Sequence, residues 1–388
     1  MGGAAAALLS AAAASLASSG ADTRPAAAAR DVVAFHSGRY PGSWRGYNLS
    51  ALTSIVSTGD LASADGRALA AAGRAGGLGV ALCKGCKLHC GNCTHDPDCP
   101  PLHDHQPWVE QLVSNATKRG TDSISLDLES NTDPAWAEQL TALTASVRST
   151  LRRKNPRGTV SFCVGYETDH AGERVGYNVT ALAGVADYLF VMAYNSNVHV
   201  PHAMQRCDLD TVRQSVDSLL GEHRVPPSKL VLGLAWFGTD FICVDGTNPS
   251  ACTPCDVVDA TVKDSRRVII FRDALTLLHA NASSGRCWSN ETSSPFFSYY
   301  SRKDGKVHQV HYEDAESLRL KYAVAASRGL RGVGIWTADM GVPSAVEEWG
   351  NGPREMQQMW TELAAYRDAP PATLHDADPG APKLLKHE

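Results

Sequence analysis

The sequence of 388 residues has no block of Lys or Arg and, after its apolar first 20 residues, no apolar run long enough to cross a membrane. A membrane-spanning helix needs about 20 consecutive apolar residues. Grooves for nucleic acids and sites for acidic lipids need clustered basic residues, whereas this chain has a formal net charge of −5 and a pI of about 6.3. We therefore expect neither a nucleic-acid partner nor a membrane partner.

The sequence also lacks an internal repeat, and no Gly-x-Gly-x-x-Gly motif follows its first predicted strand. The second absence weakens the case for a doubly wound open sheet. The hydrophobic fraction of 43% and the charged fraction of 20% are those of a globular protein with a large core. Eight apolar, β-rich runs recur along the chain, at 31–36, 52–58, 77–83, 122–128, 158–165, 187–194, 229–236 and 331–338.

Helical patterns separate several of these runs. Residues 134–154 place apolar side chains three and four positions apart, and residues 314–329 begin with acidic residues and end at a glycine. Strands that alternate with helices favour a parallel sheet, and eight such units favour a closed (β/α)8 TIM barrel of class α/β. A doubly wound open sheet is the structural alternative.

The predicted barrel spans residues 30–366 and is interrupted twice. A Cys-rich insert at 83–101 follows the third strand, and an α+β-type insertion at 238–310 separates the seventh strand from the eighth. Residues 1–29 form an Ala-rich leader, and residues 367–388 form a tail rich in Pro, Asp and Lys that we expect to be disordered.

The leader and the cysteines indicate a secretory route. The first 20 residues are small and apolar and then turn to Ser and Gly, as in a secretory signal, although the positive segment of such a signal is missing. A disordered leader is the alternative. Disulfides persist in secretory compartments, and the chain has eleven cysteines. Asn-x-Ser/Thr acceptors occur at Asn48, Asn92, Asn115, Asn178, Asn281 and Asn290.

Five cysteines fall within seventeen residues of the Cys-rich insert. The pairs Cys83/Cys86 and Cys90/Cys93 have the spacing of zinc half-sites. The three residues between the pairs are far fewer than in a zinc ribbon or finger, so disulfides are favoured and no metal or cofactor is expected. Because eleven is odd, at least one thiol stays outside a disulfide, and Cys163 is our choice.

The stretch "TDSISLDLES" at 121–130 alternates polar and apolar residues. In a strand, residues two apart share a face, with Cα atoms about 6.7 Å apart, so Asp127 and Glu129 can meet. Neighbouring carboxylates resist double ionisation, which raises one pKa and suits a general acid. The alternative is a half-exposed antiparallel strand. In a barrel, however, Glu129 emerges at the C-terminal rim, where barrel enzymes place their sites.

Four segments are informative together: "DSISLDLE" (122–129), "DYLFVMAYN" (187–195), "GLAWFGTDF" (233–241) and "RGVGIWTADM" (331–340). In this order they resemble the fourth, sixth, seventh and eighth strands of family 18 glycoside hydrolases. The fourth strand of that family carries Asp-Gly-x-x-x-Asp-x-Glu, its sixth ends in Met-x-Tyr-Asp/Asn, and its eighth ends in Trp. The segment "HQVHYEDAESLRLKYA" (308–323) also has a counterpart there.

The resemblance implies a retaining, substrate-assisted glycosidase. Glu129 would be the proton donor, and Asp127 would orient and stabilise the 2-acetamido group of the substrate. The carbonyl oxygen of that group would attack the anomeric carbon, giving an oxazolinium ion that water opens. Tyr194 would bind the acetamido oxygen, and Trp336 would form the floor under the −1 sugar.

The same resemblance implies that Met192, Asn195 and Trp236 complete the wall, while Asp122 holds the strand end. Large aromatic residues at strand ends are otherwise core residues, which is the alternative for Trp236 and Trp336. Met192 is equally suited to filling the core.

Four positions depart from the family pattern. Ser123 replaces a Gly, and Ser125 replaces the Asp of many members at the inner partner of Asp127. Ser donates one hydrogen bond but cannot share a proton as a carboxyl does. Cys163 stands where members that act on chitobiose have Asp, and Phe237 replaces a Tyr.

The resemblance predicts a monomer, lysosomal or secreted, that binds N-acetylglucosamine-containing oligosaccharides. Its substrates would be the chitobiose cores of Asn-linked glycans or short chitooligosaccharides. A chitinase-like lectin is one alternative, although such lectins commonly replace the Glu that is present here as Glu129. An endochitinase is another, but its long aromatic groove fits poorly with an aromatic fraction of 7%.

Overall fold

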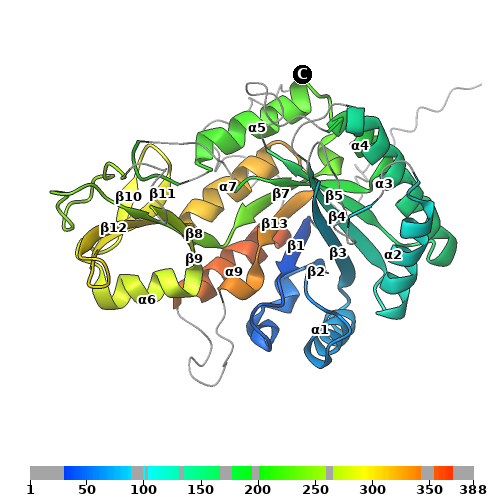
Figure 1. Ribbon diagram of the computed structural model, residues 1–388, viewed down its shortest axis with the longest axis horizontal. Coiled ribbons are helices and arrows are strands. Elements are labelled where there is room, and N and C mark those ends of the chain that lie inside the picture. Colours follow the sequence, from blue (N-terminus) through cyan, green and yellow to red (C-terminus); the bar gives the residue numbers. More distant parts are fainter. Residues whose placement is uncertain are drawn as a thin grey trace, which may run out of the picture.

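The structure is a computed structural model that describes residues 30–88, 99–100, 104–130, 135–166, 177–194, 201–205, 207–258, 265–341 and 354–369. Eight parallel strands close into a barrel in the order β1, β13, β7, β6, β5, β4, β3, β2 (Figure 1). The expected (β/α)8 barrel is therefore confirmed. Its strands are β1 (Asp31–His36), β2 (Ser54–Ser57), β3 (Gly79–Leu88), β4 (Ser123–Ser130), β5 (Val160–Gly165), β6 (Tyr188–Met192), β7 (Leu230–Ala235) and β13 (Gly332–Trp336).

Helices surround this barrel, and several begin at side chains that cap them. Ser63 accepts from the backbone of Gly66 at the start of α1, and Asp314 and Ser317 form a reciprocal capping box at the start of α7. No described helix combines the length and apolarity needed to cross a bilayer. The helices are α1 (Ala64–Ala75), α2 (Gln106–Lys118), α3 (Ala135–Lys154), α4 (Val179–Val185), α5 (Leu209–Gly221), α7 (Ala315–Ser327) and α9 (Arg354–Asp368).

The insertion between β7 and β13 forms a second, antiparallel sheet in the order β10, β11, β12, β8, β9. It lies beside the barrel with α6 across one end (Figure 1). Two disulfides, Cys243–Cys255 and Cys252–Cys287, cross-link it. The expected α+β-type insertion is thus confirmed. Its elements are β8 (Phe237–Ile242), β9 (Arg266–Ile270), α6 (Phe271–Asn281), β10 (Cys287–Ser289), β11 (Ser294–Ser301) and β12 (Lys306–His311).

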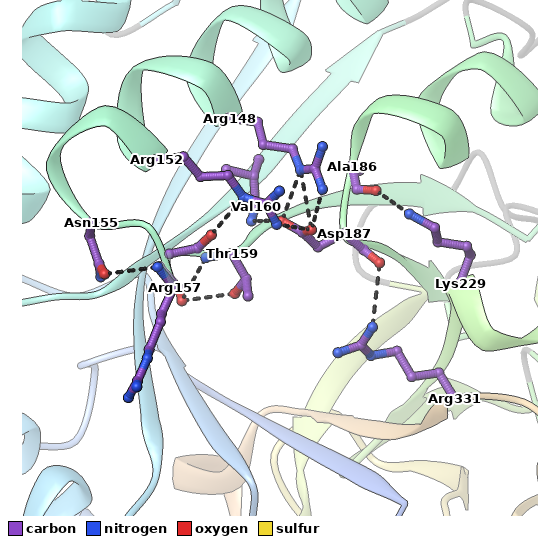
Figure 2. Close-up of polar contacts among 12 residues, drawn as sticks. Arg148, Arg152, Asn155, Arg157, Thr159, Val160, Ala186, Asp187, Lys229 and Arg331 are labelled. Atoms are coloured by element: carbon purple, nitrogen blue, oxygen red, sulfur yellow. Dashed lines mark hydrogen bonds and ion pairs between the residues drawn. The ribbon is translucent and has the colours of Figure 1, made fainter.

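The carboxylate of Asp187 ties several elements together at the N-terminal end of the barrel strands (Figure 2). Arg148 and Arg152 of α3 both donate to it, over 2.8 and 2.7 Å. The backbone amide of Val160, where β5 begins, donates over 2.8 Å. Arg331, just before β13, reaches the backbone carbonyl of Asp187 over 3.4 Å. This network stabilises the barrel end that lies opposite the predicted site.

Two expected boundaries are wrong. The third strand runs to Leu88 rather than to residue 83, because β3 stays paired with β4 along eight residues, from Ala81 opposite Ser123 to Leu88 opposite Ser130. Its second half contains two lysines and a glycine, which concealed that pairing in the sequence. The tail was expected from residue 367, but α9 continues to Asp368.

The first six residues of the Cys-rich insert, 83–88, are therefore strand. Cys86, on β3, forms a disulfide with Cys99, while Cys83 is a buried thiol that faces into the barrel. Cys83 and Cys86 accordingly do not form a zinc half-site, and the disulfide interpretation holds for Cys86. Cys90 and Cys93 lie outside the described residues.

Candidate active site

Strand β4 divides its side chains between two surfaces. Leu126 and Leu128 are fully buried in the apolar layer between barrel and helices. Since side chains alternate along a strand, Ser125, Asp127 and Glu129 project into the barrel interior. Glu129 is the last residue but one of β4, so the structure brings both carboxylates to the C-terminal end of the barrel, as the sequence predicted.

Ser125 lies deeper in the interior, below Asp127. Its side chain is fully buried and accepts from the hydroxyl of Ser161 on β5, over 3.0 Å. The Ser125 oxygen lies 3.8 Å from the sulfur of Cys163. Cys163 is a buried thiol, as expected. Neutral hydroxyl and thiol groups therefore occupy the space on the inner side of Asp127.

Tyr194 and Trp336 face each other across the site. Their rings are nearly parallel, with an interplanar angle of 12° and centroids 6.1 Å apart. Burial, the Cys163 thiol and the Asp127 carboxylate raise the pKa of the Tyr194 phenol well above its usual value. Tyr194 is therefore a protonated hydroxyl that can donate a hydrogen bond, next to the two carboxylates.

Met192 packs against the same interior cluster as Trp336, so the structure brings these two expected site residues together. Asn195 lies outside the described residues. Asp122 accepts from the backbone amide of Val80 over 3.0 Å, at the N-terminal end of β4. This bond ties the start of β4 to β3.

The structure corrects the expected position of Trp236. The sequence placed it in the wall of the site, but its side chain is fully buried and packs against Trp360 of α9, with ring centroids 4.7 Å apart. The backbone explains the difference. Trp236 follows β7, where the alternation sends Ala235 and Phe237 toward the interior cluster and Trp236 toward the helices.

Sequence reasoning missed the aromatic support beneath Trp336. Phe35 at the end of β1 contacts the Trp336 ring, with centroids 5.2 Å apart, and Phe190 of β6 contacts Phe35 at 4.6 Å. The alternation in "DVVAFH" and "DYLFVM" contained this information, because it places one aromatic residue of each strand in the barrel interior.

A second missed group fixes the segment after Trp336. Asp339 is fully buried and accepts from the backbone amide and the hydroxyl of Ser37, over 3.1 and 2.6 Å. The hydroxyl of Thr337 donates to the same carboxylate over 2.5 Å. Asp339 lies in the short 3-10 helix η4 (Ala338–Met340), so it joins the ends of β1 and β13 beside Trp336.

The barrel, its inserted sheet and the two carboxylates on β4 agree with one family of known proteins. The profile of glycosyl hydrolases family 18 matches residues 101–341. The chain belongs to glycosyl hydrolases family 18. The matched region contains β4, Tyr194 and Trp336.

Curated relatives of this family 18 chain include two from rodents. Over 245 residues it is 30% identical to the di-N-acetylchitobiase of Rattus norvegicus. Over 248 residues it is 29% identical to the di-N-acetylchitobiase of Mus musculus. Each match covers 60% of this chain and 64% of the relative, so the chain spans just under two thirds of their length.

Solved structures with little sequence identity share the fold. The spore cortex-lytic enzyme SleL of Bacillus megaterium matches with a TM-score of 0.64 at 18% identity, over 89% of this chain and 75% of its own. A chitinase from Cycas revoluta in complex with (GlcNAc)4 matches with a TM-score of 0.64 at 15% identity, over 87% of this chain and 99% of the chitinase chain. Both similarities concern the fold alone.

Proposed function

We propose that this chain hydrolyses β-1,4-linked N-acetylglucosamine by a retaining, substrate-assisted mechanism. Its substrates are chitobiose cores of Asn-linked glycans or short chitooligosaccharides. The observation that carries the proposal is the pairing of Glu129 with Asp127 on one interior face of β4, next to the Tyr194 hydroxyl. Family membership and the two di-N-acetylchitobiase relatives support the substrate class.

The first step breaks the glycosidic bond. Glu129 donates its proton to the glycosidic oxygen, so the leaving sugar departs as an alcohol. The carbonyl oxygen of the 2-acetamido group attacks the anomeric carbon and forms the oxazolinium ion. Asp127 accepts a hydrogen bond from the acetamido N–H and stabilises the positive charge that develops on this group. The Tyr194 hydroxyl donates to the acetamido oxygen.

The second step opens the oxazolinium ion. The Glu129 carboxylate takes a proton from a water molecule, whose oxygen attacks the anomeric carbon from the side that the leaving group vacated. The acetamido group is restored, and the product keeps the configuration of the substrate. Two inversions at the same carbon give this retention without an enzyme nucleophile, which is why Asp127 can lie beside Glu129.

Trp336 provides the apolar surface on which the −1 sugar rests. Its ring is partly exposed, whereas Phe35 beneath it is buried. Met192 borders the same surface. Asn195 completes the wall in this proposal.

Three disulfides within the described residues indicate an oxidising, extracytoplasmic compartment. The proposal is more specific and places the protein in the lysosome or outside the cell, as a monomer. The chitobiase-type relatives and the predicted glycosylation acceptors support this placement.

The test compares the wild-type protein with Glu129→Gln on di-N-acetylchitobiose and on longer N-acetylglucosamine oligomers. We expect release of N-acetylglucosamine by the wild type and a rate lower by about 10²–10⁴-fold in the variant, because the proton donor is lost. Equal, negligible release by both proteins would contradict the proposal. Tight binding without turnover would identify a lectin, and internal cleavage of long oligomers would identify an endochitinase.

A further inference from the structure

The end of β4 that carries the two carboxylates is paired along only one of its edges. On one side, β3 stays paired with it to the last residue of the strand. On the other side, the described register with β5 ends at Leu126, opposite Phe162. Asp127 and Glu129 therefore lie on a part of β4 that a backbone ladder holds from the β3 side alone.

The backbone carbonyl of Leu128, between the two carboxylates, points to the β5 edge. The backbone amide of Ile124 donates to the Thr159 carbonyl, just before β5, over 2.9 Å. The backbone groups of every second residue point to the same neighbouring strand, so those of Leu128 share this direction. Leu128 is fully buried, so its carbonyl needs a donor from the protein rather than from bulk water.

Tyr177 supplies this donor from outside the barrel. Its hydroxyl donates to the Leu128 carbonyl over 2.6 Å, across 49 positions of the chain. The carbonyl belongs to the peptide unit that leads directly into Glu129. Tyr177 packs against the apolar layer between barrel and helices, so it acts on the main chain of β4 without facing the barrel interior.

The position of Tyr177 is itself fixed by two neighbours. Its ring meets the ring of Phe162 on β5 edge-on, with centroids 5.6 Å apart and an interplanar angle of 73°. The next residue, Asn178, caps α4, because its side-chain oxygen accepts from the backbone amide of Ala181 over 2.9 Å. A side chain that is locked by packing and by an adjacent cap can hold its partner in one place.

We propose that Tyr177 is a positioning residue, whose hydroxyl takes the place of a β5 backbone donor and fixes the peptide that leads into Glu129. This inference rests on the proposed function, because the placement of Glu129 matters for proton transfer to the glycosidic oxygen. Without the hydroxyl, the end of β4 would be held by β3 alone, and the carboxyl of Glu129 would sample a wider range of positions.

The experiment compares Tyr177→Phe with a matched variant at the other end of the same strand. Tyr177→Phe removes only the hydroxyl, and it should lower kcat for di-N-acetylchitobiose on the order of 10-fold with little change in KM, because a small misplacement of a reacting group is costly. The control is Thr121→Val, just before β4. The Thr121 hydroxyl also donates to a backbone carbonyl, that of Ala116, over 2.9 Å.

Two further measurements separate positioning from a general loss of structure. Each variant loses one hydroxyl-to-carbonyl bond, so thermal unfolding should show a lower Tm for both, whereas kcat measured well below Tm should fall in Tyr177→Phe alone. A thiazoline mimic of the oxazolinium ion has no glycosidic oxygen to protonate. Its affinity, measured by calorimetry, should therefore fall less in Tyr177→Phe than kcat does.

The outcomes distinguish this inference from the proposed function. If the wild type hydrolyses the disaccharide, the inference alone is overturned by an unchanged kcat in Tyr177→Phe, by an equal loss of kcat in Thr121→Val, or by an equal fall in thiazoline affinity. A wild type that does not hydrolyse the disaccharide overturns the proposed function and this inference together. A loss of kcat confined to Tyr177→Phe, with thiazoline binding retained, supports the inference.

Discussion

At the scale of single residues, two glycines shape the floor of the site. Cβ atoms at Gly233 of β7 and Gly334 of β13 would lie 2.4 and 2.3 Å from the ring of Phe190. Both distances are far shorter than any real contact, so glycine is required at both positions. The space that the glycines leave is filled by Phe190, which supports Phe35 and, through it, Trp336.

Gly334→Ala should destabilise the protein by about 1–3 kcal/mol, because overpacking a tight core forces side chains and backbone to shift. A shift of Phe190 would also be passed to Trp336 and weaken substrate binding. The matched control is Gly184→Ala in α4, where an added Cβ would meet nothing within 4 Å. Thermal unfolding should show a lower Tm for Gly334→Ala and an equal or slightly higher Tm for the control.

At the scale of elements, Asp187 joins α3 to the start of β5 and β6 (Figure 2). Burial opposes ionisation of its carboxyl, but hydrogen bonds from Arg148 and Val160 outweigh burial and lower its pKa. A carboxyl with a lowered folded-state pKa contributes stability above its unfolded value of about 3.9. That contribution is lost as the pH falls through the folded-state pKa.

Asp187→Asn should therefore lower the free energy of unfolding at pH 7 by about 1–3 kcal/mol, since it removes charge-assisted hydrogen bonds. The difference from wild type should be constant above about pH 5 and shrink below about pH 4. Denaturant unfolding at several pH values measures it. Asp273→Asn, which removes an exposed pair with Arg272, serves as the control and should change stability by less than about 1 kcal/mol. A difference that grows toward low pH would contradict this account.

His308 connects strands of the inserted sheet. Its ring contacts the buried carboxylate of Asp240 on β8 over 3.0 Å and Asp304 over 2.9 Å. Burial lowers the pKa of His308, but the contacts with Asp240 and Asp304 outweigh burial and raise it, and the Asp304 pKa falls to about 2. Arg267 and Tyr299 also donate to Asp240.

A histidine with a raised folded-state pKa contributes stability that is complete below its unfolded value of about 6.5 and is lost as the pH rises through the folded-state value. His308→Gln should therefore lower Tm more at pH 5 than at pH 8.5. His202→Gln removes an exposed histidine–aspartate pair, with Asp256, and should cause little change at either pH. An equal loss for His308→Gln at both pH values would show that its charge does not stabilise the sheet.

At the scale of the whole molecule, the sequence predicted the features that depend on the alternation of apolar and polar residues and on the order of strands and helices along the chain. The eight strand runs and the two carboxylates on β4 followed from local patterns, because a parallel barrel repeats one unit and ends every strand at the same rim. The insertion between β7 and β13 was visible as a long interval without the repeat.

Features that depend on a neighbouring strand could not be predicted. The extension of β3 to Leu88 comes from its pairing with β4, and the burial of Trp236 comes from packing against α9, 124 positions further along the chain at Trp360. The bonds from Ser37 to Asp339 connect residues 302 positions apart in the sequence. No periodicity within one segment contains such information.

We propose that Glu129 and Asp127 perform substrate-assisted hydrolysis. The most direct measurement is proton NMR of the first product formed from di-N-acetylchitobiose by the wild type and by Glu129→Gln. We expect the N-acetylglucosamine from the non-reducing end to form first as the β-anomer. The wild type should therefore give an initial excess of β-anomer over the α/β ratio that the reducing-end sugar brings from the substrate, and this excess should decay by mutarotation, while the variant releases almost none. An initial excess of α-anomer over the substrate's own α/β ratio, or equal release by both proteins, would contradict this mechanism.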